Sequence, residues 1–324
     1  MMHSFSHISI VSDIFQKYTN LSYCRYVPSL LNLVRRSGRG FAARAVSYAG
    51  HGSPDDIADI EKWMSKKNER DTDIAWTLDG QIKHKEAYMD MLAADLKERA
   101  ERHNTKLNNP RYIFMAHSIG CFMIQRLLIF RPDILKQTDL VIMMMPFNRM
   151  KSDWWSEFLL NAFSSNPDTV IGHAQSLMRV LVTFPVHVLD TLLKGDIKCE
   201  NGRKITVDIL QQPHFGRNFF ELGMEEVRDL PEVPDVCAYR TIGKQCPTAI
   251  LYVGNDKWAR HFHMTDLQEL QSKGVIPNNI HVEYMPDIVH DYVVRPPMVP
   301  PVDDFCFRHI QRHVLDVRQP RSRL

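Results

Sequence analysis

Three residues of this sequence have the types that nucleophilic catalysis requires, and each comes shortly after an apolar run typical of a β-strand. Ser118 follows the run from Tyr112 to Met115, Asp256 follows Thr248 to Val253, and His290 follows His281 to Met285. A serine hydroxyl becomes a nucleophile when a histidine removes its proton and a carboxylate holds that histidine in the correct tautomer. Because functional groups collect where parallel strands end, the sequence predicts that Ser118, Asp256 and His290 meet as a catalytic triad.

The segment around the serine predicts a sharp turn between a strand and a helix. It reads Ala116-His117-Ser118-Ile119-Gly120 and leads directly into a stretch rich in Ile, Leu and Met. Such a turn needs small residues two positions before and two positions after the serine, and Ala116 and Gly120 meet that need. The turn would place the Ile119 N–H at the start of the helix, where it can donate to an oxyanion. The alternative is an ordinary strand-to-helix turn without a chemical role.

Other titratable residues compete for the roles of base and acid. Asp287 and Asp291 flank His290 too closely in sequence to be its obvious partner, while Asp256 has the alternative of a solvated turn aspartate. Structural roles are the simpler interpretation for three further histidines: His51 in a glycine turn, His84 in a helix, and His117 with its side chain directed away from the serine hydroxyl.

The sequence predicts no metal and no cofactor. His309 and His313 have the i, i+4 spacing that metal sites use, but no third ligand is evident. The six cysteines are scattered without a CxxC pair, which argues against a zinc ribbon and against a disulfide framework: Cys24, Cys121, Cys199, Cys237, Cys246 and Cys306.

Composition is that of a globular protein rather than of a nucleic-acid binder. Hydrophobic residues make up 44% and charged residues 24% of the 324 positions, and the net charge of +2 favours neither nucleic acid nor an acidic substrate. The N-terminus lacks the features of a signal peptide, and no uninterrupted apolar run approaches the ~20 residues that span a bilayer. We expect a cytoplasmic protein that can still lie on a membrane surface.

Strands and helices alternate along most of the chain, which predicts a parallel sheet covered on both faces. The expected strands run from Ala42 to Tyr48, Tyr112 to Met115, Leu140 to Met145, Thr248 to Val253 and His281 to Met285. The expected helices run from Tyr23 to Val34, Leu78 to His103, Met264 to Lys273 and from Pro296 to about Val317. The stretch from His7 to Ile14 has the composition of a strand but no evident second strand beside it. We divide the chain into a core at residues 1–147, a helical cap at 148–246 and a second core segment at 247–324.

Several stretches together resemble the lipid droplet-associated hydrolases, a branch of the α/β-hydrolase superfamily. The resemblance implies an α/β-hydrolase fold with a cap, and a serine esterase that cleaves lipid esters at the droplet surface. It places the nucleophile on Ser118, the acid on Asp256 and the base on His290. The matching segments are Tyr48 to Gly52, Leu78 to Lys85, His117 to Gly120, Pro146 to Met150, Tyr252 to Trp258 and Val289-His290.

The chain departs from the family pattern at two places. Ala116 stands where the family usually has Gly, a change that the turn should tolerate. A Pro-Gly-Asn-Pro-Gly-like loop, expected shortly before Tyr23, is replaced by the segment from Gln16 to Asn20. That loop would supply a second oxyanion-hole N–H, and losing one such donor costs about 10² to 10³ in rate. We expect the first strands of the sheet to be missing, either because the chain starts at a wrong position or because it is a degenerate relative.

The cap region bears on where the protein acts. The stretch from Ser176 to Leu193 is apolar apart from Arg179, His187 and Asp190, and Pro185 should interrupt it. Two interpretations stay open: a pair of amphipathic helices that enters a phospholipid monolayer together with Trp154, Trp155, Phe158 and Phe163, or a cap over an apolar acyl pocket. We expect localisation at the droplet surface or in the cytoplasm, with association with the endoplasmic reticulum as a further option. A non-catalytic lipid-surface protein is the alternative function.

Overall fold

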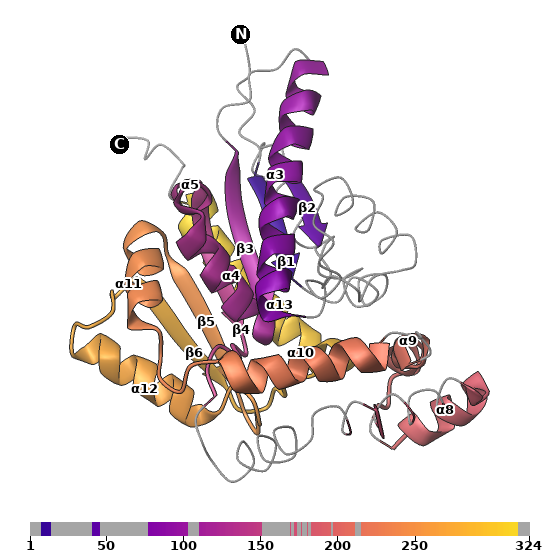
Figure 1. The fold of residues 1–324 in the computed structure, drawn as a ribbon. Coiled ribbons are helices and arrows are strands. Elements are labelled where there is room, and N and C mark those ends of the chain that lie inside the picture. The colour runs from indigo at the N-terminus through magenta and orange to yellow at the C-terminus, as the bar shows by residue number, and fades with distance from the viewer. Residues whose placement is uncertain are drawn as a thin grey trace.

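A six-stranded sheet forms the centre of the molecule (Figure 1). The computed structural model describes residues 8–13, 41–45, 77–102, 110–150, 169, 172–173, 176, 180, 183–195, 197–210 and 215–316. The strand order is β2-β1-β3-β4-β5-β6, and every neighbouring pair is parallel. The strands are β1 (Ile8–Asp13), β2 (Phe41–Ala45), β3 (Arg111–His117), β4 (Thr138–Met144), β5 (Thr248–Val253) and β6 (Ile280–Met285).

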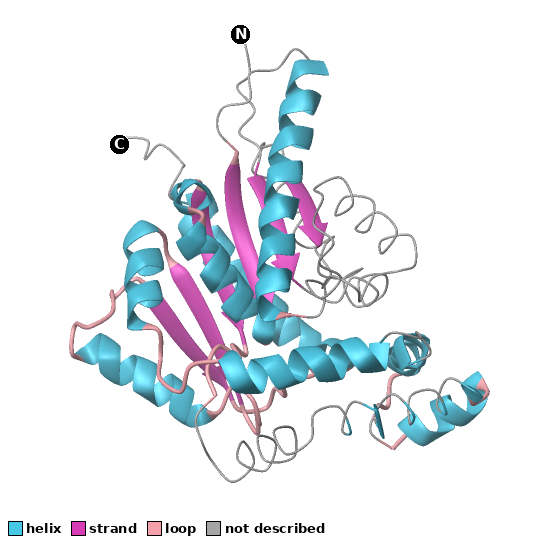
Figure 2. Ribbon diagram, viewed as in Figure 1, coloured by secondary structure: helices cyan, strands magenta, loops and turns pink. Residues whose placement is uncertain are grey.

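The central strands are apolar because both faces of the sheet are covered. β5 is buried along its whole length, and β3 and β4 are buried at nearly every position. A parallel sheet between two helical layers gives such continuous hydrophobic runs, in contrast to the alternation of a half-exposed sheet. Figure 2 shows the helices in front of and behind the strands. The predicted class of fold, a mostly parallel sheet flanked by helices, is therefore confirmed.

The N-terminal part of the sheet differs from the prediction. β1 from Ile8 to Asp13 is a strand, and it pairs with β2 on one side and with β3 on the other. We expected the N-terminal strands to be missing, and for residues 8–13 this expectation is wrong, because they form β1. The partners of β1 lie about thirty and a hundred residues away along the chain, and no local pattern in the sequence announces such pairing.

Helices connect the strands and agree with the sequence pattern where the pattern was long. The helix expected from Leu78 to His103 is α3 (Leu78–Arg102), and the one expected from Met264 to Lys273 is α12. The expected helix from Tyr23 to Val34 lies outside the described residues. α12 spans His261–Ser272, and the other α-helices are α4 (Ile119–Phe130), α5 (Pro132–Lys136), α8 (Val186–Leu193), α9 (Glu200–Leu210), α10 (Phe215–Asp229), α11 (Val236–Gln245) and α13 (Val299–Ile310), which continues into the π-helix η5 (Gln311–Leu315).

Between β4 and β5 the described residues form helices and no strand. α10 contacts α3 and α9, whereas α11 packs on α4 and α5 and contributes Tyr239 and Ile242 to the core around the sheet. α8 begins directly after Pro185, where the sequence predicted an interruption. The division into a cap at 148–246 between two core segments stays a prediction.

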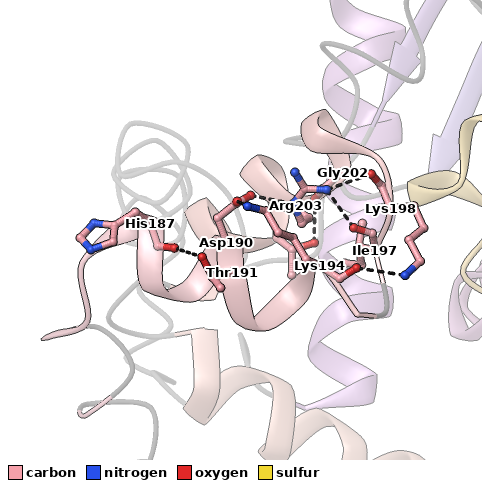
Figure 3. A network of polar contacts seen from close by, with 9 residues as sticks. His187, Asp190, Thr191, Lys194, Ile197, Lys198, Gly202 and Arg203 are labelled. Atoms are coloured by element: carbon pink, nitrogen blue, oxygen red, sulfur yellow. Dashed lines mark hydrogen bonds and ion pairs between the residues drawn. The ribbon is translucent and has the colours of Figure 1, made fainter.

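One arginine joins α8 to α9 (Figure 3). The Arg203 guanidinium donates to the Asp190 carboxylate at 2.7 Å and to the carbonyl oxygens of Ile197 and Lys198 at 3.1 and 2.9 Å. The arginine hydrogen bond is the leading cause that holds the pKa of Asp190 below its usual range, and Lys194 adds to the effect. The two helices therefore form one unit that does not depend on their apolar contacts alone.

Candidate active site

The turn at Ser118 has the strained backbone of a nucleophile elbow. Ser118 lies between β3 and α4 with φ 56° and ψ −130°, a conformation that residues other than glycine rarely adopt. Its N–H donates to the Met144 carbonyl at 3.0 Å, and its own carbonyl accepts from the N–H groups of Cys121 and Phe147 at 3.0 and 3.1 Å. These bonds fix the turn to the end of the neighbouring strand β4. The hydroxyl is thereby held at the carboxyl edge of the sheet.

The same edge carries two further residues in the left-handed region. Met145 directly after β4 has φ 48°, and Asn255 after β5 has φ 49°. Three adjacent strands therefore end in sharp turns on one side of the sheet. Backbone strain of this kind concentrates at functional sites, where surrounding structure maintains it.

Asp256 is positioned by the turn that follows β5. Gly254 is essential to this turn, because a methyl group at its position would overlap the backbone carbonyl of Pro286 after β6. The Asp256 carboxylate is buried, and its Oδ1 accepts from the backbone N–H groups of Trp258 and Ala259 at 2.8 and 2.9 Å. Burial opposes ionisation, but the hydrogen bond from His290, its charge and the two N–H groups outweigh burial and lower the pKa of Asp256. The side chain is therefore a carboxylate at neutral pH and not a solvated turn residue.

His290 connects the carboxylate to the serine. Its Nδ1 lies 2.8 Å from Asp256 Oδ2, and its Nε2 lies 2.8 Å from Ser118 Oγ. With a carboxylate on one side, the neutral ring carries its proton on Nδ1 and donates it to Asp256. Nε2 is then free to accept the serine proton. The structure thus brings together the three residues that the sequence predicted.

His117 has a role that the sequence did not indicate. Its Nε2 lies 3.0 Å from the backbone carbonyl oxygen of His290, and the two rings are 4.9 Å apart. Burial is the main cause that lowers the pKa of His117 to about 3, so the ring is neutral and donates its single proton from Nε2. The edge of the ring also contacts Tyr292 at 5.6 Å. The residue next to the serine therefore supports the loop that carries the histidine.

Of the two backbone donors expected for an oxyanion hole, the described residues include one, the Ile119 N–H. Ile119 opens α4, and the N–H groups of the first helical turn have no acceptor within their own helix. A second donor would come from the segment after β1, since Asp13 pairs in register with Ala116, two residues before the serine. The segment from Gln16 to Asn20, where the sequence departs from the family pattern, lies outside the described residues.

An apolar cluster covers the elbow. It joins the residue after the serine, Ile119, with Phe147 after β4, Leu222 of α10 and Leu230 directly after α10. Trp258, two residues beyond Asp256, packs against the cluster and lies 5.2 Å from the Phe147 ring. We call this set the elbow cluster; its remaining members are Leu78, Ile82, Phe122, Met123 and Met150. In the part of the chain that the structure describes, this side of the site is therefore bordered by hydrocarbon.

The competing residues occupy other places. Asp291 forms an ion pair with Arg295 at 2.9 Å, and His84 is half-buried in α3, where desolvation lowers its pKa to about 3. His51 lies outside the described residues. His309 and His313 do acquire a third histidine, His281, but the rings of His309 and His313 stack with an angle of 7° between their planes. Within the described part of the chain, no group of three or more His, Cys, Asp or Glu side chains could hold a metal ion.

The fold and the elbow define the class of protein: a parallel sheet with a strand–serine–helix turn at its carboxyl edge is an α/β-hydrolase. Solved structures agree on the fold. Rv0554 from Mycobacterium tuberculosis has a TM-score of 0.53 at 14% identity, covering 96% of this chain and 91% of its own. The peroxisomal α/β-hydrolase Lpx1 from Saccharomyces cerevisiae has a TM-score of 0.53 at 12% identity, with 99% and 80% covered. A thioesterase domain from the curacin biosynthetic pathway has 0.51 at 14% identity, with 94% and 91% covered.

Within this class the chain belongs to the lipid-droplet associated hydrolase family, whose model matches residues 23–293. It is thus a member of a hydrolase family whose name associates it with lipid droplets. No curated protein sequence matches the chain. None of the helices among the described residues combines the length and apolar character that crossing a bilayer requires.

Proposed function

We propose that this protein is a serine esterase that hydrolyses carboxylic esters of apolar lipids at the lipid-droplet surface. The observation that carries the proposal is the unbroken hydrogen-bond series from Asp256 through His290 to Ser118, with both separations at 2.8 Å. This is within the reach that general-base activation of a serine requires. No cofactor takes part in such a reaction.

The reaction follows from the proton positions. His290 Nε2 takes the hydroxyl proton while Ser118 Oγ attacks the ester carbonyl carbon, and the Ile119 N–H donates to the oxyanion that forms. The tetrahedral intermediate expels the alcohol, which receives the proton from His290. Water then attacks the acyl-enzyme with the same base and releases the acid. Asp256 stays ionised throughout and stabilises the imidazolium.

The surroundings favour an apolar ester at a lipid surface. The elbow cluster offers hydrocarbon contacts to an acyl chain or an apolar alcohol. Large exposed hydrophobic side chains gather on α8 and the segment before it: Val180, Phe184, Val186 and Leu192. These four are half of the large exposed hydrophobic residues among those described, so such side chains are concentrated here and not spread evenly over the surface. A concentration of this kind favours contact with a phospholipid monolayer.

The test uses an active-site label and a soluble ester. A fluorophosphonate should react with the wild-type protein, and Ser118→Ala should abolish both labelling and hydrolysis. Ser272→Ala is a matched control, because Ser272 is an exposed serine at the end of α12 and should leave both unchanged. Labelling that persists in Ser118→Ala would exclude this mechanism.

A second candidate is a non-catalytic protein that binds the droplet with a hydrolase scaffold. The segment from Gln16 to Asn20 supports it, because that segment lacks the glycines and prolines of an oxyanion loop. This candidate predicts droplet binding that does not depend on Ser118 and no turnover of any ester. Hydrolysis that Ser118→Ala removes would exclude it.

A further inference from the structure

Arg149 is a buried charge that the proposed mechanism does not use. It lies in the segment after β4, and its side chain is 4% exposed. Its Nη2 donates to Asp266 Oδ2 at 2.7 Å and to the carbonyl oxygen of Phe262 at 3.4 Å. Both acceptors belong to the first two turns of α12, the helix that begins shortly after Asp256. A buried charge is tolerated only where it is paired and hydrogen-bonded, so these contacts fix the segment after β4 to the start of α12.

The segment that carries Arg149 is also fixed to the turn of the nucleophile. Phe147, two residues before Arg149, is buried, and its N–H donates to the Ser118 carbonyl at 3.1 Å. Asn148 lies between them, is also buried, and donates from its side chain to the Tyr239 hydroxyl of α11 at 2.5 Å. Three consecutive residues therefore hold the serine turn, α11 and α12 to one another.

On the other side, hydrogen-bonded turns connect α12 to the catalytic acid. The Asp256 carboxylate accepts from the N–H groups of Trp258 and Ala259 at 2.8 and 2.9 Å. The carbonyl of Arg260 then accepts from the His263 N–H in the first turn of α12, at 2.9 Å. The chain from the acid to the helix is thus short and internally bonded. A shift of the start of α12 would therefore move the Asp256 carboxylate with it.

We infer that Arg149 is a positioning residue that holds Asp256 at the distance from Ser118 that His290 can bridge. This rests on the proposed esterase function and adds a residue to it. The imidazole ring has a fixed width, so its two nitrogens reach both partners at 2.8 Å only while Ser118 and Asp256 keep their separation. Arg149 bonds to α12 and not to the triad itself, so it acts through Asp256.

Arg149→Met keeps an unbranched apolar stem but removes the guanidinium. For para-nitrophenyl butyrate, kcat per folded molecule should fall about 10- to 100-fold with little change in KM, because a displacement of about 1 Å costs up to about 10² in rate. Urea unfolding gives the folded fraction. In an Asp256→Asn background the same substitution should cost less than about threefold, because the carboxylate that Arg149 positions is already absent. A purely structural role would lower kcat by the same factor in both backgrounds.

Arg111→Met is the matched control. Arg111 forms a comparable ion pair with Asp139 at 2.5 Å, at the amino ends of β3 and β4, and its loss should leave kcat per folded molecule unchanged. If Arg149→Met does not fold, Asp266→Ala breaks the same pair from a side chain that is 35% exposed, and it should show the same loss. A wild-type kcat in the folded variant, or an equal loss in both backgrounds, would overturn the positioning role while leaving the esterase intact. A wild-type protein that does not hydrolyse the ester would overturn the proposed function, and this inference with it.

Discussion

His117 differs from the triad residues in its hydrogen bond. Its ring donates to the backbone carbonyl of His290, whereas the triad residues are joined through their side chains. The His117 N–H holds the carbonyl of His290, so it fixes the position of that residue without touching its imidazole nitrogens. General-base catalysis depends steeply on such placement, and a displacement of about 1 Å can cost about 10² in rate. His117 is therefore a positioning residue in the proposed mechanism.

Replacing His117 by phenylalanine keeps an aromatic ring against Tyr292 but removes the donor. We expect His117→Phe to lower kcat on propyl butyrate by about 10- to 100-fold with little change in KM, because the loop that carries His290 loses its support. His261→Phe is the control, since His261 is exposed and makes a similar edge contact with Tyr284 at 5.1 Å. Equal activity of the two variants would contradict the role assigned to His117.

Residue types predicted part of the site, and backbone geometry supplied the rest. Ser118, Asp256 and His290 could be selected because each has a distinctive chemistry and follows a strong apolar run. The contribution of His117 could not be predicted, because the sequence around His117 gives no indication of a contact with a backbone carbonyl 173 residues away. The positive φ of Ser118 was implied by the small residues at positions 116 and 120.

At the scale of elements, length and apolarity decided which strands could be predicted. β5 matched its expected bounds, Thr248 to Val253, because a fully buried strand is a nearly continuous apolar run, and here Pro247 and Gly254 delimit it. β1 has the composition of a strand but no local partner, so its place between β2 and β3 could not be anticipated. The apolar periodicity of the sequence predicted the helix that begins at Leu78, but it did not predict which elements this helix packs against.

α8 exposes hydrocarbon in a way that the proposed lipid-surface function requires. Val186 and Leu192 are 54% and 64% exposed, while Leu189 is buried and Asp190 is tied to Arg203 of α9. Leu189 and Asp190 therefore attach α8 to the rest of the protein, while Val186 and Leu192 of the same helix face solvent. Substitution of the exposed pair should leave the α8–α9 unit intact.

We expect the double variant Val186→Asp, Leu192→Asp to bind phospholipid-coated triglyceride emulsions at least about tenfold more weakly than wild type. Transferring two aliphatic side chains from water to lipid is worth about 1.5 to 3 kcal/mol each, and the new charges oppose entry. Flotation of the protein with the emulsion measures the effect. Val233→Asp removes a hydrophobic side chain that is 68% exposed elsewhere and should bind as wild type does. Undiminished flotation of the double variant would remove α8 from the lipid contact.

Across the whole molecule, several histidines of the sheet and of the helices on it have a lowered pKa and are neutral at pH 7. Burial is the leading cause that lowers the pKa of each. The pKa falls to about 3 for His84, His117 and His263 and to about 4 for His313, and it is also lowered for His281 and His309. In the last group Arg308 and Arg312 oppose protonation as well, while Glu283 favours it. Two carboxyl groups behave in the opposite sense, because burial raises the pKa of Asp303 to about 7 and that of Glu226 to about 8.

The sign of the pH dependence follows from these two sets. A histidine whose pKa is lowered by folding binds its proton in the unfolded chain first, so stability is lost as pH falls below about 6.5. A carboxyl group whose pKa is raised keeps its proton in the folded state and adds stability as pH falls through the same window. The three histidines whose pKa is lowered to about 3 already outnumber the two carboxyl groups. The free energy of unfolding should therefore fall between pH 6.5 and 4.5, by at least about 1.4 kcal/mol per pH unit near pH 5.

Urea unfolding at a series of pH values measures this slope, and His263 tests its origin. His263 is 2% exposed, and its Nδ1 is buried without a hydrogen bond. His263→Met should therefore remove about one proton from the linkage and make the pH dependence shallower by about 1.4 kcal/mol per unit near pH 5. His187→Gln alters an exposed histidine of α8 and should keep the wild-type slope. A wild-type stability that stays level from pH 6.5 to 4.5 would mean that the buried imidazoles take up protons in the folded state.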